Sequence, residues 1–459
     1  MKVAVTGSSG QLGTQVLRRL LDDRTVESVI AIDLNPPRLV GRKLKTVIAD
    51  VRDPEIGRHL VTCDALAHLA FIIAQQRPRG LVDSVNVGGS KNVFAAAAAA
   101  GVKTIVYTSS VAAYGALPGH PDPIVEETPR KLHESFPYAA AKYRVEEYLD
   151  TFEPQHPDVA ICRLRPSILI GPGMDHPLGA ALRRRLMPDF GAPTLPLVWN
   201  EDVADAVILG LKNRTRGAFI LSAGEQLSAR ALATLVGFRY LHVRRPVALL
   251  LSRVSPLLAR LGLMREIDRA WIESNDVALS FSSDKARRVL GWKPRCNTSA
   301  EVMRRYVETV PGALDGRVRL FVRLISLGSR LQPPQLELKG FRSRILLALT
   351  GRRGGDISIT AADQRLRFAT GAPSAPTAVV TLPAELFLEL LAGRADFATA
   401  QLTGRIRVEG EGHAMLLVGG LVTQVRSMAQ SSGARGTFGK LIQRVAAADP
   451  RGEQRRNEA

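Results

Sequence analysis

KVAVTGSSGQLGTQVLRRLLDD (residues 2–23) is the stretch of sequence that decides the fold. Residues 2–6 have the apolar, β-branched character of a buried strand, and a helical pattern follows a short loop. That loop contains Gly7, Gly10 and Gly13. Glycines are needed there because the backbone must turn tightly, approach a pyrophosphate closely and let the helix pack on the sheet. The stretch therefore predicts a strand, a phosphate-binding loop and a helix.

The next apolar run, SVIAID (residues 28–33), ends in Asp33. An acidic residue about 20 residues after such a loop accepts hydrogen bonds from an adenosine ribose. Its charge repels a 2′-phosphate, which favours NAD over NADP as the cofactor. Arg38 and Arg42 lie close in sequence, so NADP stays open.

Further strands follow in a βαβ rhythm. KTVIAD (45–50), ALAHLA (65–70) and TIVYTSS (104–110) have strand patterns, and the Ala-rich SKNVFAAAAAAGV (90–102) is spaced as a crossover helix. We therefore expect an α/β fold, a Rossmann doubly wound parallel sheet with a small substrate subdomain.

The stretch SFPYAAAKYRVEEYL (135–149) carries candidate chemistry. Tyr138 and Lys142 are four residues apart, which places them on one face of a helix. A phenol with a pKa near 10 is a poor base at neutral pH, but a nearby ammonium favours the phenolate. Ser109 and Ser110 end a strand at the carboxyl edge of the sheet, where a hydroxyl orients a substrate oxygen. The set indicates proton transfer at a carbinol.

Together these motifs resemble an extended short-chain dehydrogenase/reductase of the NAD-dependent epimerase/dehydratase superfamily. The resemblance runs in family order across residues 1 to about 310. It implies that Tyr138 is the base, that Lys142 steadies the phenolate and binds the nicotinamide ribose, and that Ser110 is the hydroxyl partner. The stretches that carry it are TGSSGQLG, ADVRD, HLA, NVGGSKNV, YTSSVAAYG, YAAAK, RLRPSILIGPG, WNEDVADA and SSDKARRVLGWKPR.

The same resemblance implies a cofactor groove and no metal. The glycine loop holds the pyrophosphate, the residues after the third strand lie by the adenine, and Pro166 approaches the nicotinamide. The implied cofactor-binding residues are Gly7, Ser9, Gly10, Gln11, Leu12, Gly13, Asp33, Asp50, Val51, Leu69, Ala70, Tyr138, Lys142 and Pro166.

Two departures narrow the reaction. Sugar dehydratases of this family carry an acid directly after the strand-end hydroxyl, whereas this chain has Val111 and Ala112, which disfavours dehydration. Phe71, Ile72 and Ile73 then give an apolar stretch that suits a lipid better than a nucleotide-sugar. Simple packing of these three side chains is the alternative.

Composition limits the partners and the compartment. The chain has 459 residues, a formal net charge of +19 and three widely spaced cysteines. The arginines are scattered and no nucleic-acid motif is present, so we expect no nucleic-acid partner. The cysteines and the lack of a signal peptide or spanning segment at the start predict a cytoplasmic protein. Whether it forms a homodimer stays open.

Two basic, apolar segments suggest contact with a membrane surface. In residues 238–265 leucines and valines alternate with arginines, as expected for an interfacial segment or for a roof over the substrate pocket. We expect Pro246 and Pro256 to break any single long helix there. Residues 312–334 form a basic amphipathic linker, for which a connecting helix between domains is favoured over membrane docking. Peripheral membrane association therefore stays open.

After Pro333 and Pro334 the pattern changes to alternating strands, as in half-buried antiparallel sheets. A helix is predicted after Pro383. The stretch VTLPAELFLELLAGRADFATAQLTGRIRVEGEGHAMLLV resembles the sterol carrier protein 2 (SCP2) lipid-transfer family. That resemblance covers about residues 335–425 and implies an α+β domain whose five-stranded sheet and helices enclose an apolar tunnel. Residues 426–459 are predicted to be a disordered tail.

In the favoured interpretation, the chain combines an extended short-chain dehydrogenase/reductase domain (1–311) with an SCP2-like domain (335–425). It is an NAD(P)-dependent oxidoreductase, similar to a 3β-hydroxysteroid dehydrogenase, that interconverts a hydroxyl and a ketone on a sterol- or lipid-like substrate. Tethering a lipid-binding domain raises the local concentration of such a substrate. The alternative is a nucleotide-sugar epimerase with an accessory lipid domain. A non-catalytic NAD-sensing lipid carrier is disfavoured by Ser110, Tyr138 and Lys142.

Overall fold

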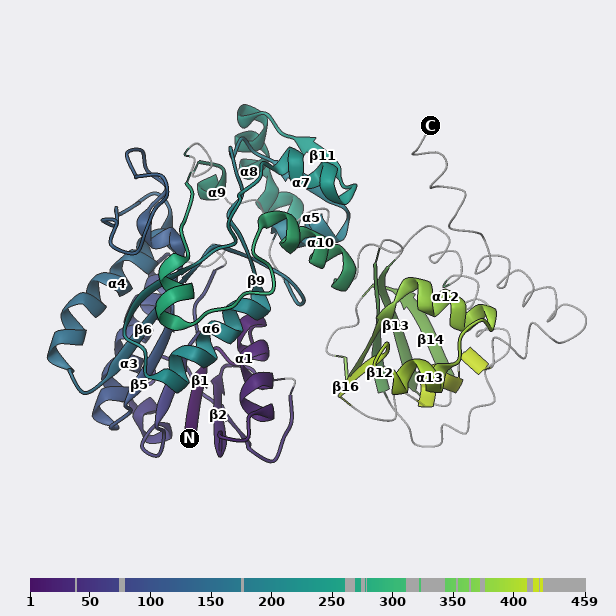
Figure 1. Cartoon of the computed structure of the whole chain (residues 1–459), viewed down its shortest axis with the longest axis horizontal. Helices are drawn as coiled ribbons and strands as arrows, with labels where there is room; N and C mark the ends of the chain where they lie inside the picture. Colours follow the sequence, from purple (N-terminus) through teal and green to yellow (C-terminus); the bar gives the residue numbers. More distant parts are fainter. Residues whose placement is uncertain are drawn as a thin grey trace, which may run out of the picture. The chain divides into compact units, whose positions relative to one another are not determined.

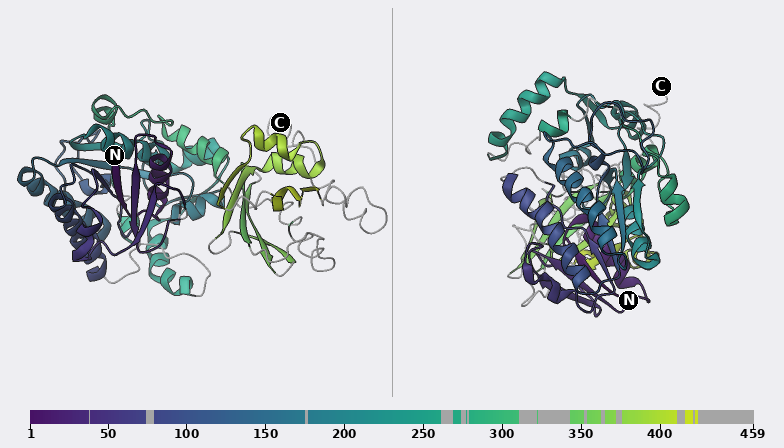
Figure 2. Two further views of the ribbon diagram at one scale, coloured as in Figure 1. Left: turned by 90° about the horizontal axis from the view of Figure 1, so that it is seen from below. Right: turned by 90° about the vertical axis from the view of Figure 1, so that its left-hand side faces the viewer.

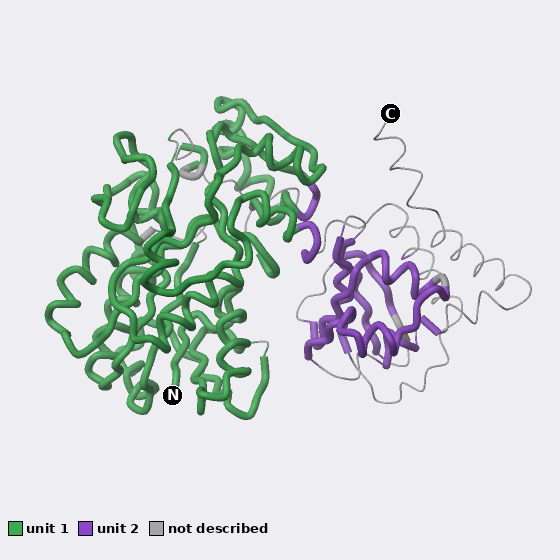
Figure 3. The backbone as a smooth tube through the Cα atoms, in the orientation of Figure 1, with its two compact units in different colours: residues 1–182, 186–306 green, residues 183–185, 307–459 purple. Residues whose placement is uncertain are grey.

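The computed structural model divides into two compact units, residues 1–182 with 186–306 and residues 183–185 with 307–459 (Figure 3). Each unit is described by itself. The predicted linker (apart from Val322), the predicted tail and Arg38 lie outside the described residues. The described residues are 1–37, 39–73, 79–174, 177–260, 269–273, 277, 279–310, 322, 343–351, 354–362, 365–371, 376–410, 416–420 and 422–423.

Seven parallel strands form the central sheet of the first unit, in the order β10-β6-β5-β4-β1-β2-β3 (Figure 1). Successive strands extend to one side of β1 as far as β3, and the chain then crosses to β4 on the other side. In open parallel sheets ligands bind beside such a reversal, which here lies at the carboxyl ends of β1 and β4. The strands are β1 (Lys2–Thr6), β2 (Ser28–Asp33), β3 (Leu44–Ile48), β4 (Ala65–His68), β5 (Thr104–Thr108), β6 (Ala160–Pro166) and β10 (Gly217–Leu221).

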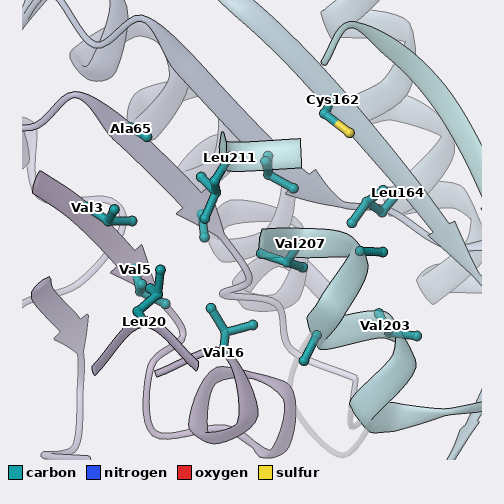
Figure 4. Packing of buried hydrophobic residues seen from close by; sticks show 14 of the residues in the cluster. Val3, Val5, Val16, Leu20, Ala65, Cys162, Leu164, Val203, Val207 and Leu211 are labelled. Carbon is teal, nitrogen blue, oxygen red and sulfur yellow. The ribbon is translucent and has the colours of Figure 1, made fainter. Parts of the chain in front are cut away.

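Helices cover both faces of this sheet (Figures 1 and 2). On one face α1 (Gln11–Asp22) and α6 (Asn200–Asn213) bury apolar side chains at helical spacing against the strands. Figure 4 shows this packing. On the other face α3 (Gly89–Ala99) and α4 (Pro137–Gln155) pack in the same way. The predicted doubly wound parallel sheet is thus confirmed.

Shorter elements complete the first unit, including two small sheets that pair β7 with β9 and β8 with β11. The remaining elements are η1 (Pro54–His59), α2 (Arg79–Asp83), η2 (Ser84–Gly88), η3 (Val111–Tyr114), β7 (Ile168–Ile170), α5 (Pro177–Arg183), β8 (Leu186–Asp189), β9 (Leu197–Trp199), α7 (Ala229–Val236), β11 (Arg239–His242), α8 (Arg245–Arg260), α9 (Arg269–Glu273), η5 (Ala286–Leu290) and α10 (Ser299–Thr309).

The expectation of a break is wrong for Pro256, which lies inside α8, whereas α8 begins at Arg245, next to Pro246. Pro246 is in the first turn, where the missing N–H has no helical partner in any case. Pro256 deprives the carbonyl of Ser252 of its helical donor. The hydroxyl of Ser255 donates a hydrogen bond to that oxygen instead, at 3.1 Å. The helix therefore continues past Pro256.

The second unit contains a five-stranded sheet in the order β14-β13-β12-β15-β16. Most pairs are antiparallel as predicted, but β12 and β15 are parallel, so the sheet is mixed. One face of β13 and β15 is buried against α12 and α13. The elements are β12 (Ser343–Thr350), β13 (Gly355–Ala362), β14 (Arg365–Thr370), β15 (Ala378–Pro383), α12 (Ala384–Ala392), α13 (Phe397–Leu402) and β16 (Arg407–Gly410).

The ends of α12 follow from its sequence. It begins directly after Pro383, as predicted, and Gly393 terminates it with φ of 77°. Near β16, Ile406 is buried and Val408 packs on the same apolar cluster, as the alternation predicted. Across the described parts of both units, no helix has the length and apolar character needed to cross a membrane.

Candidate active site

The glycine loop after β1 meets the loop after β4 at the reversal of strand order. Gly7 has φ of 71°, and a Cβ built on it would lie 2.5 Å from the main-chain nitrogen of Ala70. A Cβ on Gly13 would lie 2.2 Å from the carbonyl oxygen of Gly7. Real atoms cannot approach that closely, so only glycine fits at either position. Gly7, Gly13 and Ala70, which the sequence analysis assigned to one groove, are therefore brought together.

The start of α1 fits an anionic group. Gly10 is the N-cap, no side chain caps the helix, and its first turn has no acidic residue. The unsatisfied N–H groups and the helix dipole favour a phosphate. Within the described part of the chain, the buried Ser8 hydroxyl has no hydrogen-bond partner. Ser8, which sequence reasoning missed, adds a further polar group beside this loop. These residues fit the pyrophosphate of a dinucleotide.

Asp33 lies at the end of β2, where its carboxylate holds the same loop. It accepts hydrogen bonds from the backbone N–H of Ser9 at 3.0 Å and of Asn35 at 3.1 Å. Each carboxylate oxygen keeps a second lone pair for a ribose hydroxyl. Ser9 and Asp33, both predicted to contact the cofactor, are therefore brought together.

The other expected groove residues have varied surroundings. Gln11 donates a hydrogen bond to the carbonyl oxygen of Pro172 at 3.2 Å, and Leu12 packs against the apolar core. Asp50 forms a bidentate pair with Arg52, at 3.0 and 2.7 Å. The Arg52 hydrogen bond lowers the pKa of Asp50 despite partial burial. The Asp50 carboxylate is thus already engaged within its own turn.

Asn92, on α3, holds the loop that contains Val51. Its amide donates to the carbonyl oxygens of Val51 at 2.9 Å and Asp53 at 2.8 Å. Asn86 holds the loop after β4 in the same manner, because its side chain bonds to both the N–H and the carbonyl of Ile72. Sequence reasoning assigned no such bracing role to either asparagine. An amide can brace a loop because it both donates and accepts.

The candidate catalytic residues converge at the ends of β5, β6 and the start of α4. Ser110 follows β5, and its hydroxyl acts to lower the pKa of the Tyr138 phenol. The Ser110 hydroxyl also lies 3.4 Å from the carbonyl oxygen of Pro166, at the end of β6. Lys142 is one turn beyond Tyr138 on α4. Four residues separated by up to 56 positions in sequence therefore meet at one edge of the sheet.

Lys142 is buried, and its Nζ atom contacts three partners. Its Nζ donates to the carbonyl oxygen of Thr108 at 2.7 Å and lies 3.3 Å from the hydroxyl of Tyr107. It also lies 3.5 Å from the ring centroid of Phe71, which is a cation–π contact. Burial lowers the pKa of Lys142 well below its usual value, and Glu146 opposes this effect.

The pKa of the Tyr138 phenol differs from the expectation. Burial raises this pKa, and the Ser110 hydroxyl acts in the opposite direction. The sequence predicted that Lys142 would lower that pKa. Because burial disfavours the charged ammonium and Lys142 bonds to Thr108, desolvation dominates instead. The Phe71 ring lies edge-on to Tyr138, with a centroid separation of 5.7 Å, and contributes to this burial.

Sequence reasoning missed a buried carboxylate, Glu146, one turn beyond Lys142. Its oxygens accept hydrogen bonds from Arg165 at 2.8 Å each, from Arg130 at 2.9 Å and from Arg163 at 3.2 Å. Arg165 also donates to the hydroxyl of Tyr114 at 2.6 Å. The sequence signal that could have identified it is an acidic residue four positions after Lys142, on the same face of the helix. This cluster ties α4 to β6 and to the turn after Ser110.

Residues 3–220 match the model of the NAD dependent epimerase/dehydratase family. This supports an epimerase/dehydratase domain over that range, and the match does not extend into the second unit. The chain is 28% identical over 314 residues to a putative dihydroflavonol 4-reductase of Synechocystis sp., covering 62% of this chain and 88% of that protein. It spans 62% of the length of three further curated relatives.

A UDP-glucose 4-epimerase of Mycolicibacterium smegmatis is 29% identical over 325 residues, which are 64% of this chain and 94% of that protein. Among solved structures, a UDP-glucose 4-epimerase from Stenotrophomonas maltophila with bound NAD and formylated UDP-arabinopyranose has a TM-score of 0.52 at 22% identity. The similarity covers 66% of this chain and 96% of that structure. At this identity the likeness supports the fold of the first unit.

Proposed function

We propose that this chain, with its epimerase/dehydratase domain over residues 3–220, binds NAD and inverts a hydroxyl-bearing carbon of a nucleotide-linked sugar. The observation that carries the proposal is the convergence of Ser110, in the turn that packs against the start of α4, with Tyr138 and Lys142 one turn apart on that helix. This group lies at the carboxyl edge of the sheet that also carries the glycine loop. The UDP-glucose 4-epimerase that matches over 94% of its length supports this substrate class.

The chain's own residues handle the proton and the position of the substrate. Tyr138 takes the proton from the substrate hydroxyl and returns it after inversion, while the Ser110 hydroxyl orients that oxygen. Lys142 stabilises the phenolate that forms. NAD held by the glycine loop and Asp33 would supply the acceptor, and then the donor, of the hydride at that carbon. An epimerase therefore shows no net change of cofactor.

Two positions support this choice of cofactor and reaction. Asp33 is held by the N–H groups of Ser9 and Asn35, so its charge stands where a 2′-phosphate would be repelled, which favours NAD. Val111 and Ala112 begin η3 directly after Ser110. Neither can act as the acid that removes water, so dehydration stays disfavoured.

A second candidate is net oxidation or reduction of an apolar alcohol or ketone, with the second unit as an SCP2-like lipid-binding domain. The Phe71 ring beside Tyr138 and the buried apolar face of the five-stranded sheet favour it. The putative dihydroflavonol 4-reductase, matched over 88% of its length, is named as a reductase. We rank this candidate second, which reverses the order expected from the sequence, because relatives named as sugar epimerases match at similar identity.

One panel of substrates separates the two candidates. Purified protein with NAD is incubated with UDP-glucose, UDP-galactose and UDP-N-acetylglucosamine, and separately with sterols and long-chain alcohols. Chromatography follows sugar epimers, and absorbance follows reduced cofactor. We expect epimers to form without net cofactor reduction. Reduced cofactor with an apolar alcohol, and no epimers from any sugar, would replace the first candidate with the second.

A further inference from the structure

We propose that α8 docks the first unit on the surface of an anionic phospholipid membrane. The helix runs from Arg245 to Arg260 and packs with α9 at the edge of this unit (Figures 1 and 2). None of the residues assigned to the candidate active site above lies on α8. The proposal is independent of the function proposed there.

Four large apolar side chains of α8 are exposed, whereas Leu249, Leu251 and Leu258 are half-buried. Val247, Leu250, Val254 and Leu257 are 49%, 59%, 39% and 62% exposed. Their spacing of three, four and three residues places them in one stripe along the helix. A stripe of this kind is ordinarily the side of a helix that is buried. Here it is left open by the described residues of the unit.

The buried side of α8 is made of small residues instead. Ala248, Ser252 and Ser255 are buried at spacings of four and three. The Ser252 hydroxyl donates a hydrogen bond to the carbonyl oxygen of Leu249 at 2.8 Å, so this buried hydroxyl has its partner within the helix. Ser255 does the same with the carbonyl oxygen of Ser252. The fully buried positions of α8 are therefore small side chains, while four branched apolar ones are exposed.

Positive charge surrounds the stripe. Arg239, Arg244 and Arg253 are exposed, and the sequence from Arg239 to Arg253 contains no Asp or Glu. The neighbouring described carboxylates are already engaged. Asp189 accepts hydrogen bonds from Tyr240 and His242, and Glu273 pairs with Arg269 at 2.7 Å. Among the described residues, Arg239, Arg244 and Arg253 therefore place exposed positive charge around an apolar stripe.

An anionic bilayer suits this combination better than other occupants do. Lipid headgroups take the guanidinium groups while the acyl boundary takes the branched side chains. Sixteen residues give a helix of roughly 24 Å, which fits in the plane of the interface. A second copy would bring the same cationic surface against itself, and nucleic acid would leave the apolar stripe uncovered.

Vesicle flotation of the full-length protein tests the apolar stripe. Vesicles of phosphatidylcholine alone are compared with vesicles containing about 30% phosphatidylglycerol. Wild type is expected to float only with the anionic vesicles. The double variant Leu250→Ser/Leu257→Ser should lower the partition coefficient for anionic vesicles about tenfold or more, since it removes two branched side chains that the membrane would bury. The matched control is Val40→Ser/Val61→Ser, which alters exposed side chains elsewhere in this unit and should bind as wild type does.

Two charge-reversal variants test the contribution of the arginines around the stripe. Arg253→Glu should weaken binding about tenfold, whereas Lys45→Glu, an exposed site near β3, should change it much less. Raising the salt concentration should weaken the binding of wild type more than that of Arg253→Glu, which retains the other arginines around the stripe. Unchanged flotation of the Leu250/Leu257 variant would overturn the proposal. So would a wild-type dimer that the same variant converts to a monomer without any change in flotation, because the stripe would then be an interface between copies.

Discussion

Arg165, at the end of β6, holds both carboxylate oxygens of Glu146 on α4, each at 2.8 Å. Both side chains are buried. Glu146 lies one turn from Lys142, and Arg165 also bonds to the hydroxyl of Tyr114 in the turn after Ser110. This pair therefore fixes the helix that carries Tyr138 and Lys142 against the turn that carries Ser110.

Glu146→Gln should change how stability depends on pH. The surrounding arginines hold the pKa of Glu146 at about 2, against 4.5 for an ordinary glutamate, although burial opposes them. A depressed pKa gives stability that is present above about pH 4.5 and lost as pH falls toward 2. Its contribution is roughly 3 kcal/mol, which Glu146→Gln should remove from the free energy of unfolding at pH 7. Denaturant unfolding at several pH values measures this.

Glu27→Gln is the matched control, because Glu27 is exposed and pairs with Lys2 only at 3.6 Å. Its unfolding curve should follow wild type. If Glu146 positions the catalytic helix, Glu146→Gln should also lower kcat more than it raises KM. A fall in stability with unchanged kcat at temperatures where the variant is folded would mean that the cluster is structural only.

Lys142→Met should stabilise the fold while it abolishes turnover. Because burial lowers the pKa of Lys142, the unfolded chain binds more protons than the folded chain from that lowered pKa up to about 10.4. The free energy of unfolding therefore rises with pH through this window, and at neutral pH the buried amine is a cost. We expect a higher Tm at pH 7 and no detectable product. A lower Tm would show that the hydrogen bond to Thr108 outweighs the desolvation of the amine.

Gly7→Ala should abolish NAD binding, since its Cβ would collide with the main chain of Ala70 and move the loop after β4. The matched control is Gly101→Ala. Gly101 has a similar φ of 81° but nothing within 4 Å of the added Cβ, so it should cost only about 1–2 kcal/mol and leave NAD affinity unchanged. Isothermal titration with NAD compares them. Equal affinities would contradict the assigned role of Gly7.

The sequence was most informative where one local pattern determines one structure. The glycine spacing and the βαβ rhythm predicted the parallel sheet, and the placement of Tyr138 and Lys142 on one helix followed from their separation of four. The alternation near Val408 predicted a half-buried strand. Each of these depends on residues that are close in sequence, so no distant partner could alter it.

What sequence could not predict depended on distant partners. The raised pKa of Tyr138 follows from burial beside Phe71, and the enclosure of Glu146 follows from arginines brought in by β6. The alternation of apolar and polar residues does not specify strand order or orientation, so it could not predict that β12 and β15 pair in parallel. The continuity of α8 through Pro256 rests on one serine hydroxyl.

The most direct test of the central claim is Tyr138→Phe, with turnover and NAD affinity measured on the same preparation. The claim is that Ser110, Tyr138 and Lys142 carry out proton transfer in an NAD site. On whichever substrate of the panel is converted, we expect kcat to fall by about 10²–10⁴-fold, since a positioned acid–base group is lost. The Kd for NAD should stay within about threefold, because the phenol's oxygen is not part of the glycine loop. Unchanged kcat, or equal loss of kcat and NAD affinity, would contradict the claim.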